Sequence, residues 1–458
     1  MAGVRWTGLF FSLGSLAISA WVGVSIGHSF RGGTVDLQGI YYGAKGLMQH
    51  RDPYKLAELK AVYESEAKKL PSGSITPSQF LAPCNNLPST LLLMTPLALL
   101  PWNAASSLWV ALLLASLLCA SMLTVQVGGC DAPKIALLLA CTLLVNCEVG
   151  VALANAGVLV VSLCTIGAWA LIRNRFVFVG QLCFAIGLAI KPHDVFLVLI
   201  YFVLAKGVHR KPAVMALGIA AAIGLAALVW MVQIAPDWMQ EWHSNVSALT
   251  ARGSLNDPGP TSPWSRGAGQ VIDLQAAVSV VEDDPRIYNP VAYVVCGGLL
   301  VVWGLTTVRA RWSEAGSWLA LASVVPLTLL VTYHRPYDAK LLLLAIPACA
   351  KLWSEGGRTG KVALGFTGAA IGLTADLPLT ILSQLNAKLD ISGLTFSERV
   401  LSAVILRPTP LSLLAMAVFF LWVYVQRSRA DWKALDMTER NSTKSASAWH
   451  PVSPLATP

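Results

Sequence analysis

The feature of this sequence that most restricts its fold is a series of apolar segments that recurs along almost the whole chain. Several of them are about 20 residues long, the length at which a helix crosses the bilayer hydrocarbon. Only 12% of the 458 residues are charged, whereas soluble domains carry about 25%. The sequence therefore predicts an all-α polytopic membrane protein.

The apolar segments predict a bundle of twelve transmembrane helices. These are residues 6–28, 104–126, 132–147, 155–172, 176–190, 193–206, 212–235, 290–308, 314–332, 338–353, 361–383 and 408–426. With both termini in the cytoplasm, the basic junctions fall on the cytoplasmic side, as the positive-inside rule expects. The formal charge of +9 then reflects loops that face anionic lipid, and we expect no nucleic-acid partner.

One apolar segment, residues 86–102, does not fit this threading as a span. Three prolines interrupt it, and a crossing there would place every later basic junction outside. We therefore expect a short helix that dips into the outer leaflet, covered by protein. The first outer loop is then 29–103 and the second is 236–289. We expect one transmembrane domain over 1–430, and the Ser- and Pro-rich residues 431–458 to form a disordered cytoplasmic tail.

The first outer loop carries an acidic residue at the start of an amphipathic helix. Thr34 is a candidate N-cap, and an apolar stripe that includes Leu37, Tyr41 and Ala44 predicts a helix lying flat at the membrane interface. Asp36 either complements the dipole of this helix or has a functional role. Further along, Asp52 before Pro53 predicts the N-cap of a second, solvated helix.

The other ionisable residues near the expected outer face fall in short breaks between apolar runs. Such groups are functional candidates because burying them costs free energy. They are Glu148, then Lys191 and His193 in the sequence KPHD, and His334, Arg335 and Asp338 in HRPYD. Lysine in such a break either snorkels to the surface or binds phosphate. The HRPYD turn is either an exposed turn with local pairing or a site that binds anions or handles protons.

The order of these motifs resembles that of the GT-C membrane glycosyltransferases. The acidic residue after the first span, the proline-bounded LLLMTPLALLPWNAASSLW, and then AIKPHDVFLVLIYF and HRPYDAKLLLLAIP resemble family 87. That group includes polyprenyl-phosphomannose-dependent mannosyltransferases, and the resemblance covers most of residues 1–430. The chain departs from the family pattern at Asn85-Asn86-Leu87-Pro88 and at Asn155-Ala156-Gly157.

The resemblance implies an inverting transfer of a sugar, mannose as the family-level expectation, from a polyprenyl phosphate. The acceptor is then a lipid or glycan at the outer face of the cell (inner) membrane. Asp36 maps onto the catalytic base and His334 onto a second catalytic residue. Lys191, Arg335 and His193 would bind the donor phosphate, and we place Tyr41, Tyr42, Glu148 and Asp338 in the substrate site. No cofactor is required, although Asp36 and Glu148 leave a divalent metal open.

Two other functions compete with this hypothesis. A transporter or flippase of a lipid-linked sugar predicts charged groups near the middle of the bilayer and on both sides of a pathway. The threading instead collects them on one side. A non-enzymatic assembly subunit predicts no cavity around Asp36 and no effect of Lys191 or His334 substitutions on product.

Overall fold

The chain is a bundle of helices joined by turns and short loops. A computed structural model describes residues 2–32, 34–68, 81–145, 148–260, 262, 271–386 and 393–447. These residues contain helices and no strand. The first half comprises α1 (Ala2–Gly32), α2 (Val35–Met48), α3 (Leu56–Ala67), α4 (Pro88–Ala98), α5 (Trp102–Gly129), α6 (Pro133–Val145), α7 (Glu148–Ala152), α8 (Ala156–Ile172), α9 (Val177–Ile190), α10 (Pro192–Leu204) and α11 (Arg210–Ile234).

The second half contains the long helices that complete the bundle and several short ones. It comprises α12 (Trp238–Thr250), α14 (Leu274–Val281), α15 (Pro285–Arg309), α16 (Glu314–Val331), the 3-10 helix η1 (Pro336–Ala345), α17 (Ile346–Glu355), α18 (Gly357–Leu373), α19 (Asp376–Asn386), α20 (Phe396–Leu406) and α21 (Pro408–Ser447). A helix occupies each expected span. The protein is thus a polytopic membrane protein, as its apolar helices indicate.

The lengths of the helices do not confirm all twelve expected crossings. Among the described residues, five helices are long and apolar enough to cross a membrane, namely α5, α11, α15, α16 and α21. The bent pair α18 and α19 would make a sixth. Helices α6, α8, α9 and α10 have 13 to 17 residues, and at 1.5 Å per residue each is shorter than about 30 Å of hydrocarbon.

Helix α16 lies at the centre of the bundle. It packs against α10, α15, α21 and η1, and nearly every one of its residues is buried. Its buried hydroxyls are satisfied within the helix: Ser323 donates to the Leu319 carbonyl and Thr328 to the Val324 carbonyl. This internal pairing lets a helix with polar residues sit in an apolar core.

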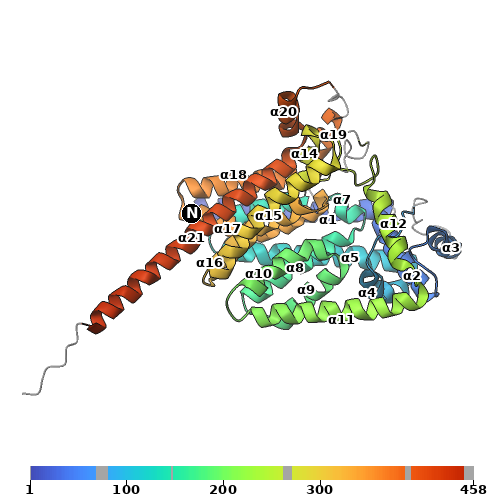
Figure 1. Ribbon diagram of the computed structural model, residues 1–458, viewed down its shortest axis with the longest axis horizontal. Coiled ribbons are helices and arrows are strands. Elements are labelled where there is room, and N and C mark those ends of the chain that lie inside the picture. The colour runs from blue at the N-terminus through green and yellow to red at the C-terminus, as the bar shows by residue number, and fades with distance from the viewer. Residues whose placement is uncertain are drawn as a thin grey trace, which may run out of the picture.

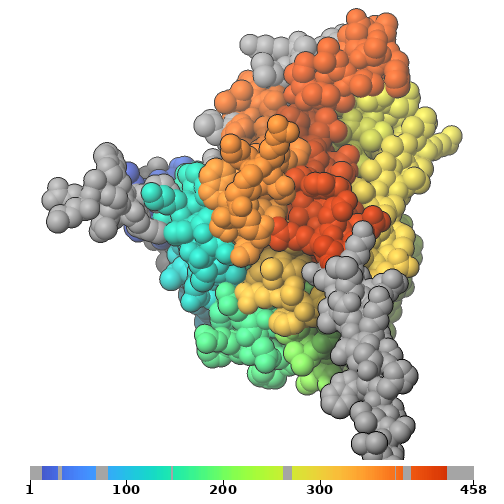
Figure 2. All heavy atoms as spheres, turned by 90° about the vertical axis from the view of Figure 1, so that its left-hand side faces the viewer, coloured from blue at the N-terminus to red at the C-terminus, as the bar shows by residue number. Residues whose placement is uncertain are grey.

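The two ends of the bundle differ in composition. Figure 1 shows α2, α3, α4 and α12 gathered at one end, with α21 projecting past the other. Figure 2 looks onto that second end, where segments from α5 and α6 (cyan) to α21 (red) meet at one face. The connections between α9 and α10 and between α16 and η1 lie at the first end.

Two expectations for the loops are corrected. Helix α2 does not bury a single stripe, because α4 packs on it and residues around most of its circumference are buried. Asp52 is not an N-cap: the next helix begins at Leu56 with Lys55 at the N-cap, and Asp52 accepts from the Tyr54 amide instead. The disordered tail expected over 431–458 stays a prediction: α21 extends to Ser447, and residues 448–458 lie outside the described chain.

Candidate active site

Asp36 stands in the first turn of α2 and faces the start of α8. Its amide donates to the Leu153 carbonyl over 3.0 Å, and its Oδ2 accepts from Asn155 Nδ2 over 2.7 Å. Asn155 is also the N-cap of α8, because its Oδ1 accepts from the Gly157 amide. Because the side-chain oxygen of Asn155 is used in the cap, its NH2 group faces Asp36. One side chain starts a helix and orients a carboxylate.

Burial raises the pKa of the Asp36 carboxyl. The Asn155 hydrogen bond and the positive charges of Arg335 and Lys191 offset part of that increase. The group therefore binds a proton more readily than an ordinary aspartate, while its polar neighbours favour the ionised form. A carboxylate of this kind is a competent proton acceptor.

Lys191 lies beside this pair, at the break between α9 and α10. Its Nζ is 2.5 Å from Asp338 Oδ1 and 3.1 Å from Asp194 Oδ2. Burial lowers the pKa of Lys191, but the two carboxylates outweigh it and the net shift is upward. A Cβ at Gly157 would lie 2.5 Å from Asp338 Oδ1 and 3.2 Å from Lys191 Nζ. Glycine at that position therefore makes room for the ion pair.

His334 and Asp194 form a second buried pair next to Lys191. His334 Nε2 is 2.9 Å from Asp194 Oδ1, and both side chains are fully buried. The His193 ring meets the His334 ring edge to face, with centroids 5.0 Å apart. His193 Nε2 is 3.8 Å from Asp194 Oδ1, too far for a hydrogen bond. Asp194 thus holds Lys191 with one oxygen and His334 with the other.

The surroundings of His334 favour its protonated form. Nδ1 lies 2.8 Å from the Thr332 carbonyl oxygen, which can only accept, and Nε2 faces an aspartate oxygen. A neutral ring would place a lone pair against one of these oxygens. Burial lowers the pKa of His334, yet the Asp194 pairing outweighs it and the net shift is upward.

Arg335, in the turn between α16 and η1, closes the cluster and contacts the loop that follows α12. Its Nη2 donates to the Leu255 carbonyl and to Asn256 Oδ1 over 3.1 and 3.0 Å, and its Nε donates to the Tyr333 hydroxyl. Its backbone amide donates to Asp338 Oδ2. The site thus combines three carboxylates and three cations drawn from distant parts of the chain, namely Asp36, Asp194, Asp338, Lys191, His334 and Arg335.

Three residues expected in the substrate site have other surroundings. Tyr41 and Tyr42 are fully buried and pack against Trp102, because α4 and the start of α5 cover α2. Glu148 pairs with His28 of α1, and its amide donates to Asp376. Tyr41 and Tyr42 therefore contribute to core packing, and Glu148 interacts with groups at helix ends. None of the three is part of the charged cluster.

One group of side chains in the described part of the chain has the spacing of metal ligands. It consists of His193, Asp194 and His334, whose donor atoms all lie within 4.8 Å of one another. It contains neither Asp36 nor Glu148, the pair that the sequence left open for a metal. In the observed arrangement Asp194 of this group pairs with Lys191 and with His334.

Sequence analysis missed Asp194 and Asn155. Asp194 follows Lys191 by three residues, the spacing of an ion pair on one helical turn, and this signal was present in KPHD. Asn155 was noted only as a departure from the family pattern. An Asn followed by a long apolar run predicts an N-cap, but nothing local connects it to residue 36.

The fold and the site define a class: a helical membrane protein with a carboxylate and a cation cluster at one end of its bundle. A sequence model of glycosyltransferase family 87 matches residues 87–332, more than half of the chain. The chain therefore belongs to glycosyltransferase family 87. The matched segment contains Asn155, Lys191 and Asp194, while Asp36 and His334 lie outside it. No curated protein sequence and no solved structure matches the chain.

Proposed function

We propose that this glycosyltransferase moves a sugar, with mannose as the first candidate, from a polyprenyl phosphate to a hydroxyl of a lipid or glycan, with inversion. The observation that carries this proposal is the placement of Asp36 next to Lys191, His334 and Arg335. A hydroxyl nucleophile needs a proton acceptor, and a departing phosphate needs positive charge. The cluster offers both, at an end of the bundle where a lipid substrate can enter from the side.

Lys191 and His193 are the groups best placed to meet the donor phosphate. Their side chains are 18% and 38% exposed, whereas those of Asp194 and His334 are fully buried. Lys191 is the N-cap of α10, and the start of a helix attracts phosphate through its free amides and its dipole. The positive charges of His334 and Arg335 lie behind these two side chains and add to the attraction for the phosphate.

The chemistry assigned to these groups balances without a redox partner. The acceptor oxygen bonds to the anomeric carbon as its proton passes to Asp36. The bond from the anomeric carbon to the phosphate oxygen breaks, and its electron pair leaves with the lipid phosphate. Attack and departure on opposite faces invert the anomeric centre. Lys191, Arg335 and His334 stabilise the leaving charge. His193, whose pKa burial lowers to about 2, is neutral and contributes as a hydrogen-bond donor.

The cations of the chain supply this charge, so we expect no metal requirement. Activity of the purified enzyme should be unchanged after incubation with EDTA and removal of the chelator. Loss of activity that Mn²⁺ or Mg²⁺ restores would contradict this and point to His193, Asp194 and His334 as ligands. A matched reaction with added Ca²⁺ controls for nonspecific effects on the lipid substrate.

We also propose the GT-C arrangement of twelve crossings in a bacterial-type inner membrane, with both termini in the cytoplasm. In this threading α6, α8, α9 and α10 cross although they are short, because neighbouring helices cover their ends. The charged cluster then faces the extracytoplasmic side, where polyprenyl-phosphate sugars are consumed.

Transfer from defined donors tests the function directly. Purified protein is supplied with polyprenyl-phosphate mannose, glucose or arabinose and a membrane lipid extract, and labelled product is measured. We expect transfer from one of them and a loss of at least about a hundredfold, the lower bound for general base catalysis, in Asp36→Asn. Glu64→Gln, at an exposed carboxylate on α3, is the control and should be fully active. Unimpaired transfer by Asp36→Asn would refute the assigned base.

A further inference from the structure

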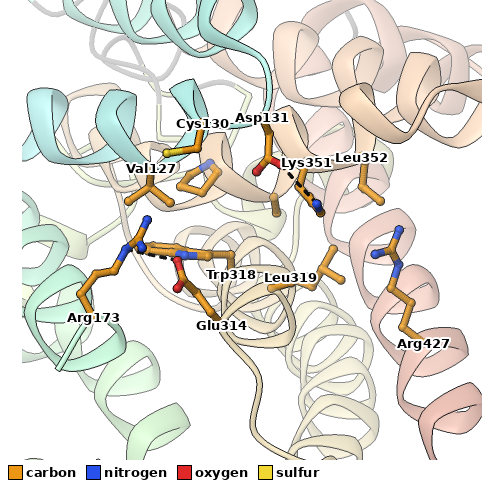
Figure 3. A pocket seen from close by; sticks show the side chains of 13 residues that line it. Val127, Cys130, Asp131, Arg173, Glu314, Trp318, Leu319, Lys351, Leu352 and Arg427 are labelled. Atoms are coloured by element: carbon orange, nitrogen blue, oxygen red, sulfur yellow. Dashed lines mark hydrogen bonds and ion pairs between the residues drawn. The ribbon is translucent and has the colours of Figure 1, made fainter.

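The two ends of the bundle differ in how completely their surface groups are partnered. A cavity of about 300 Å³ lies past the C-terminal end of α8, opposite the charged cluster. Its cations all pair with carboxylates: Figure 3 shows the Arg173–Glu314 and Lys351–Asp131 pairs, and Arg427 pairs with Glu355. The charges at this end therefore need no further partner. At the end that carries the charged cluster, helix α20 has a surface that the described residues leave uncovered.

The uncovered surface of α20 is apolar. Its exposed apolar side chains, between 42% and 73% exposed, are Phe396, Val400, Leu401, Val404 and Ile405. The spacing i, i+4, i+5, i+8 and i+9 places them on one side of the helix. A contiguous apolar surface of this kind marks a contact with another apolar body.

The two charged side chains of α20 have partners away from this apolar side. The Glu398 carboxylate accepts from the amide and the hydroxyl of Thr395 over 2.8 and 2.7 Å, so it caps the start of its own helix. Arg399 Nη1 donates to the Val281 carbonyl at the end of α14 over 3.4 Å. The exposed side of α20 therefore carries apolar groups and the small hydroxyl of Ser397.

The other side of α20 packs on α14 through a small cluster. Ala403 and Leu406 are buried there with Val280, and this cluster is separate from the main core of the bundle. The helix thus buries two apolar side chains and exposes five. Because hydrophobic stabilisation grows with the apolar area removed from water, we expect the exposed side to be covered by something outside the chain.

Two membrane spans adjoin α20 and place it at the lipid boundary. Helix α21 begins at Pro408, one residue after α20 ends, and its first 23 residues are long and apolar enough to cross the membrane. Helix α15, which follows α14 after three residues, is another such span. Its length of about 38 Å exceeds the hydrocarbon by only about 8 Å, and apolar exposure begins in its first turn at Ile287. A helix that packs on α14 and leads directly into α21 therefore lies at the edge of the hydrocarbon.

We propose that α20 is an interfacial helix whose exposed apolar side contacts the acyl chains of the bilayer beside α21. Lipid is the occupant because this surface continues from spans that already face lipid. Through α14, the contact also bears on the charged cluster. The Ile272 amide, just before α14, donates to the His334 carbonyl over 3.0 Å, and Gln275 Nε2 donates to the Val331 carbonyl over 3.2 Å. The lipid contact of α20 thus stabilises α14 against the turn that carries His334.

Spin labelling of the full-length protein in liposomes tests the lipid contact. With the native cysteines replaced, a nitroxide is attached to Leu401→Cys or Val404→Cys, and its collisions with O2, which concentrates in hydrocarbon, are compared with those of a water-soluble nickel complex. We expect both labels to favour O2, as should a label at Val418→Cys on the exposed side of α21. Leu56→Cys, at an exposed leucine on the charged helix α3, is the matched control and should favour the nickel complex. Labels on α20 that behave like the one at position 56 would overturn the proposal. Dipolar broadening between labels, with both reagents excluded, would overturn it in favour of a second copy of the chain.

A polar double variant tests whether the lipid contact supports α14. In Leu401→Asn with Ile405→Asn, amide hydrogen exchange of α14 in liposomes should become at least about tenfold faster, since burial of one such side chain changes an equilibrium by more than that factor. Exchange in α16 should stay as in the wild type, which shows that the bundle is intact. Leu56→Asn is the control and should leave α14 unchanged. Wild-type exchange of α14 in the double variant would overturn the support of the His334 turn by lipid.

Discussion

Asn155 links local structure to chemistry through a single amide. Its oxygen caps α8 and its nitrogen donates to Asp36, so the amide stabilises the ionised carboxylate. Asn155→Ser keeps a capping hydroxyl but cannot reach Asp36. Because burial already raises the pKa of Asp36, loss of this donor should raise it further. The acidic limb of the rate profile should then move to higher pH by about one unit, from a hydrogen bond to a charged group.

The measurement for Asn155→Ser is kcat/KM against pH, with Glu64→Gln as the reference. The sign follows from the base role: a carboxyl with a raised pKa accepts protons only above that pKa, so a higher value delays the onset of activity. A limb that stays in place while the rate falls uniformly would show that Asn155 acts only on the fold.

Gly157 is the glycine at which an added methyl group would meet the charged cluster. A Cβ there would approach Asp338 Oδ1 to 2.5 Å and Lys191 Nζ to 3.2 Å, and Asp338 is held from two sides. Gly157→Ala should break the ion pair, lower the unfolding temperature and reduce kcat/KM at least about tenfold, which corresponds to 1.4 kcal/mol. Gly218→Ala, where a Cβ meets no atom within 4 Å, is the matched control. Equal activity of the two variants would show that the Lys191–Asp338 ion pair can shift without loss of activity.

The sequence indicated some members of this site and not others, for physical reasons. A lysine, an arginine and a histidine in short breaks between apolar runs are expensive to bury, and this marked Lys191, His334 and Arg335. Asp194 escaped notice because it also serves as an ordinary first-turn acid of α10. Asn155 escaped because its second partner, Asp36, is 119 positions away, and no local pattern reports a contact of that range.

At the scale of elements, the short helix α4 supports the break at Lys191. Ser89 and Thr90 on its first turn donate to the Ala189 and Ile190 carbonyls over 2.5 and 3.0 Å. These carbonyls end α9, where the chain leaves the helix before Pro192 and no later amide of that helix reaches them. The hydroxyls of α4 therefore stabilise the turn that presents Lys191.

Removing both hydroxyls should weaken that turn. In Ser89→Ala with Thr90→Val, each buried carbonyl loses its partner at a cost of about 1–3 kcal/mol. We expect a lower unfolding temperature in detergent and a higher KM for the donor. Ser116→Ala is the control, because its hydroxyl donates within its own helix to Leu113. If the double variant unfolds at the control's temperature, α4 does not hold the turn.

Helices could be predicted wherever the length of an apolar run alone specifies them. Every expected span contains a helix because the apolar runs are bounded by Pro, Gly or basic residues. The ends and partners of helices were less predictable. The Asp52-Pro53 pair imitates a cap, yet the Asp52 carboxylate turns to the Tyr54 amide and the helix starts three residues later. The expected flat helix after Thr34 is enclosed because α4, distant in sequence, folds over it.

At the scale of the whole molecule, the two ends of the bundle differ chemically. Helices α8 and α16 pass from one end to the other. The charged cluster lies at one end, and the basic residues at the opposite end are what the positive-inside rule predicts for a cytoplasmic side. The orientation of the molecule therefore decides on which side of the membrane the product forms.

Thiol labelling of intact cells determines that orientation. Cys130 is exposed in the turn between α5 and α6, and Ala251 is exposed after α12, near the loop that holds Arg335. Five helices lie between them that cross in the proposed threading, namely α6, α8, α9, α10 and α11. An odd number of crossings puts the two positions on opposite sides. A variant that keeps only Cys130 should react with an impermeant maleimide only after permeabilisation. Ala251→Cys, with all native cysteines replaced, should react in intact cells. The same accessibility at both positions would mean that an even number of helices crosses the membrane between them, so the proposed threading would be wrong. The reverse pattern would place the transfer site in the cytoplasm.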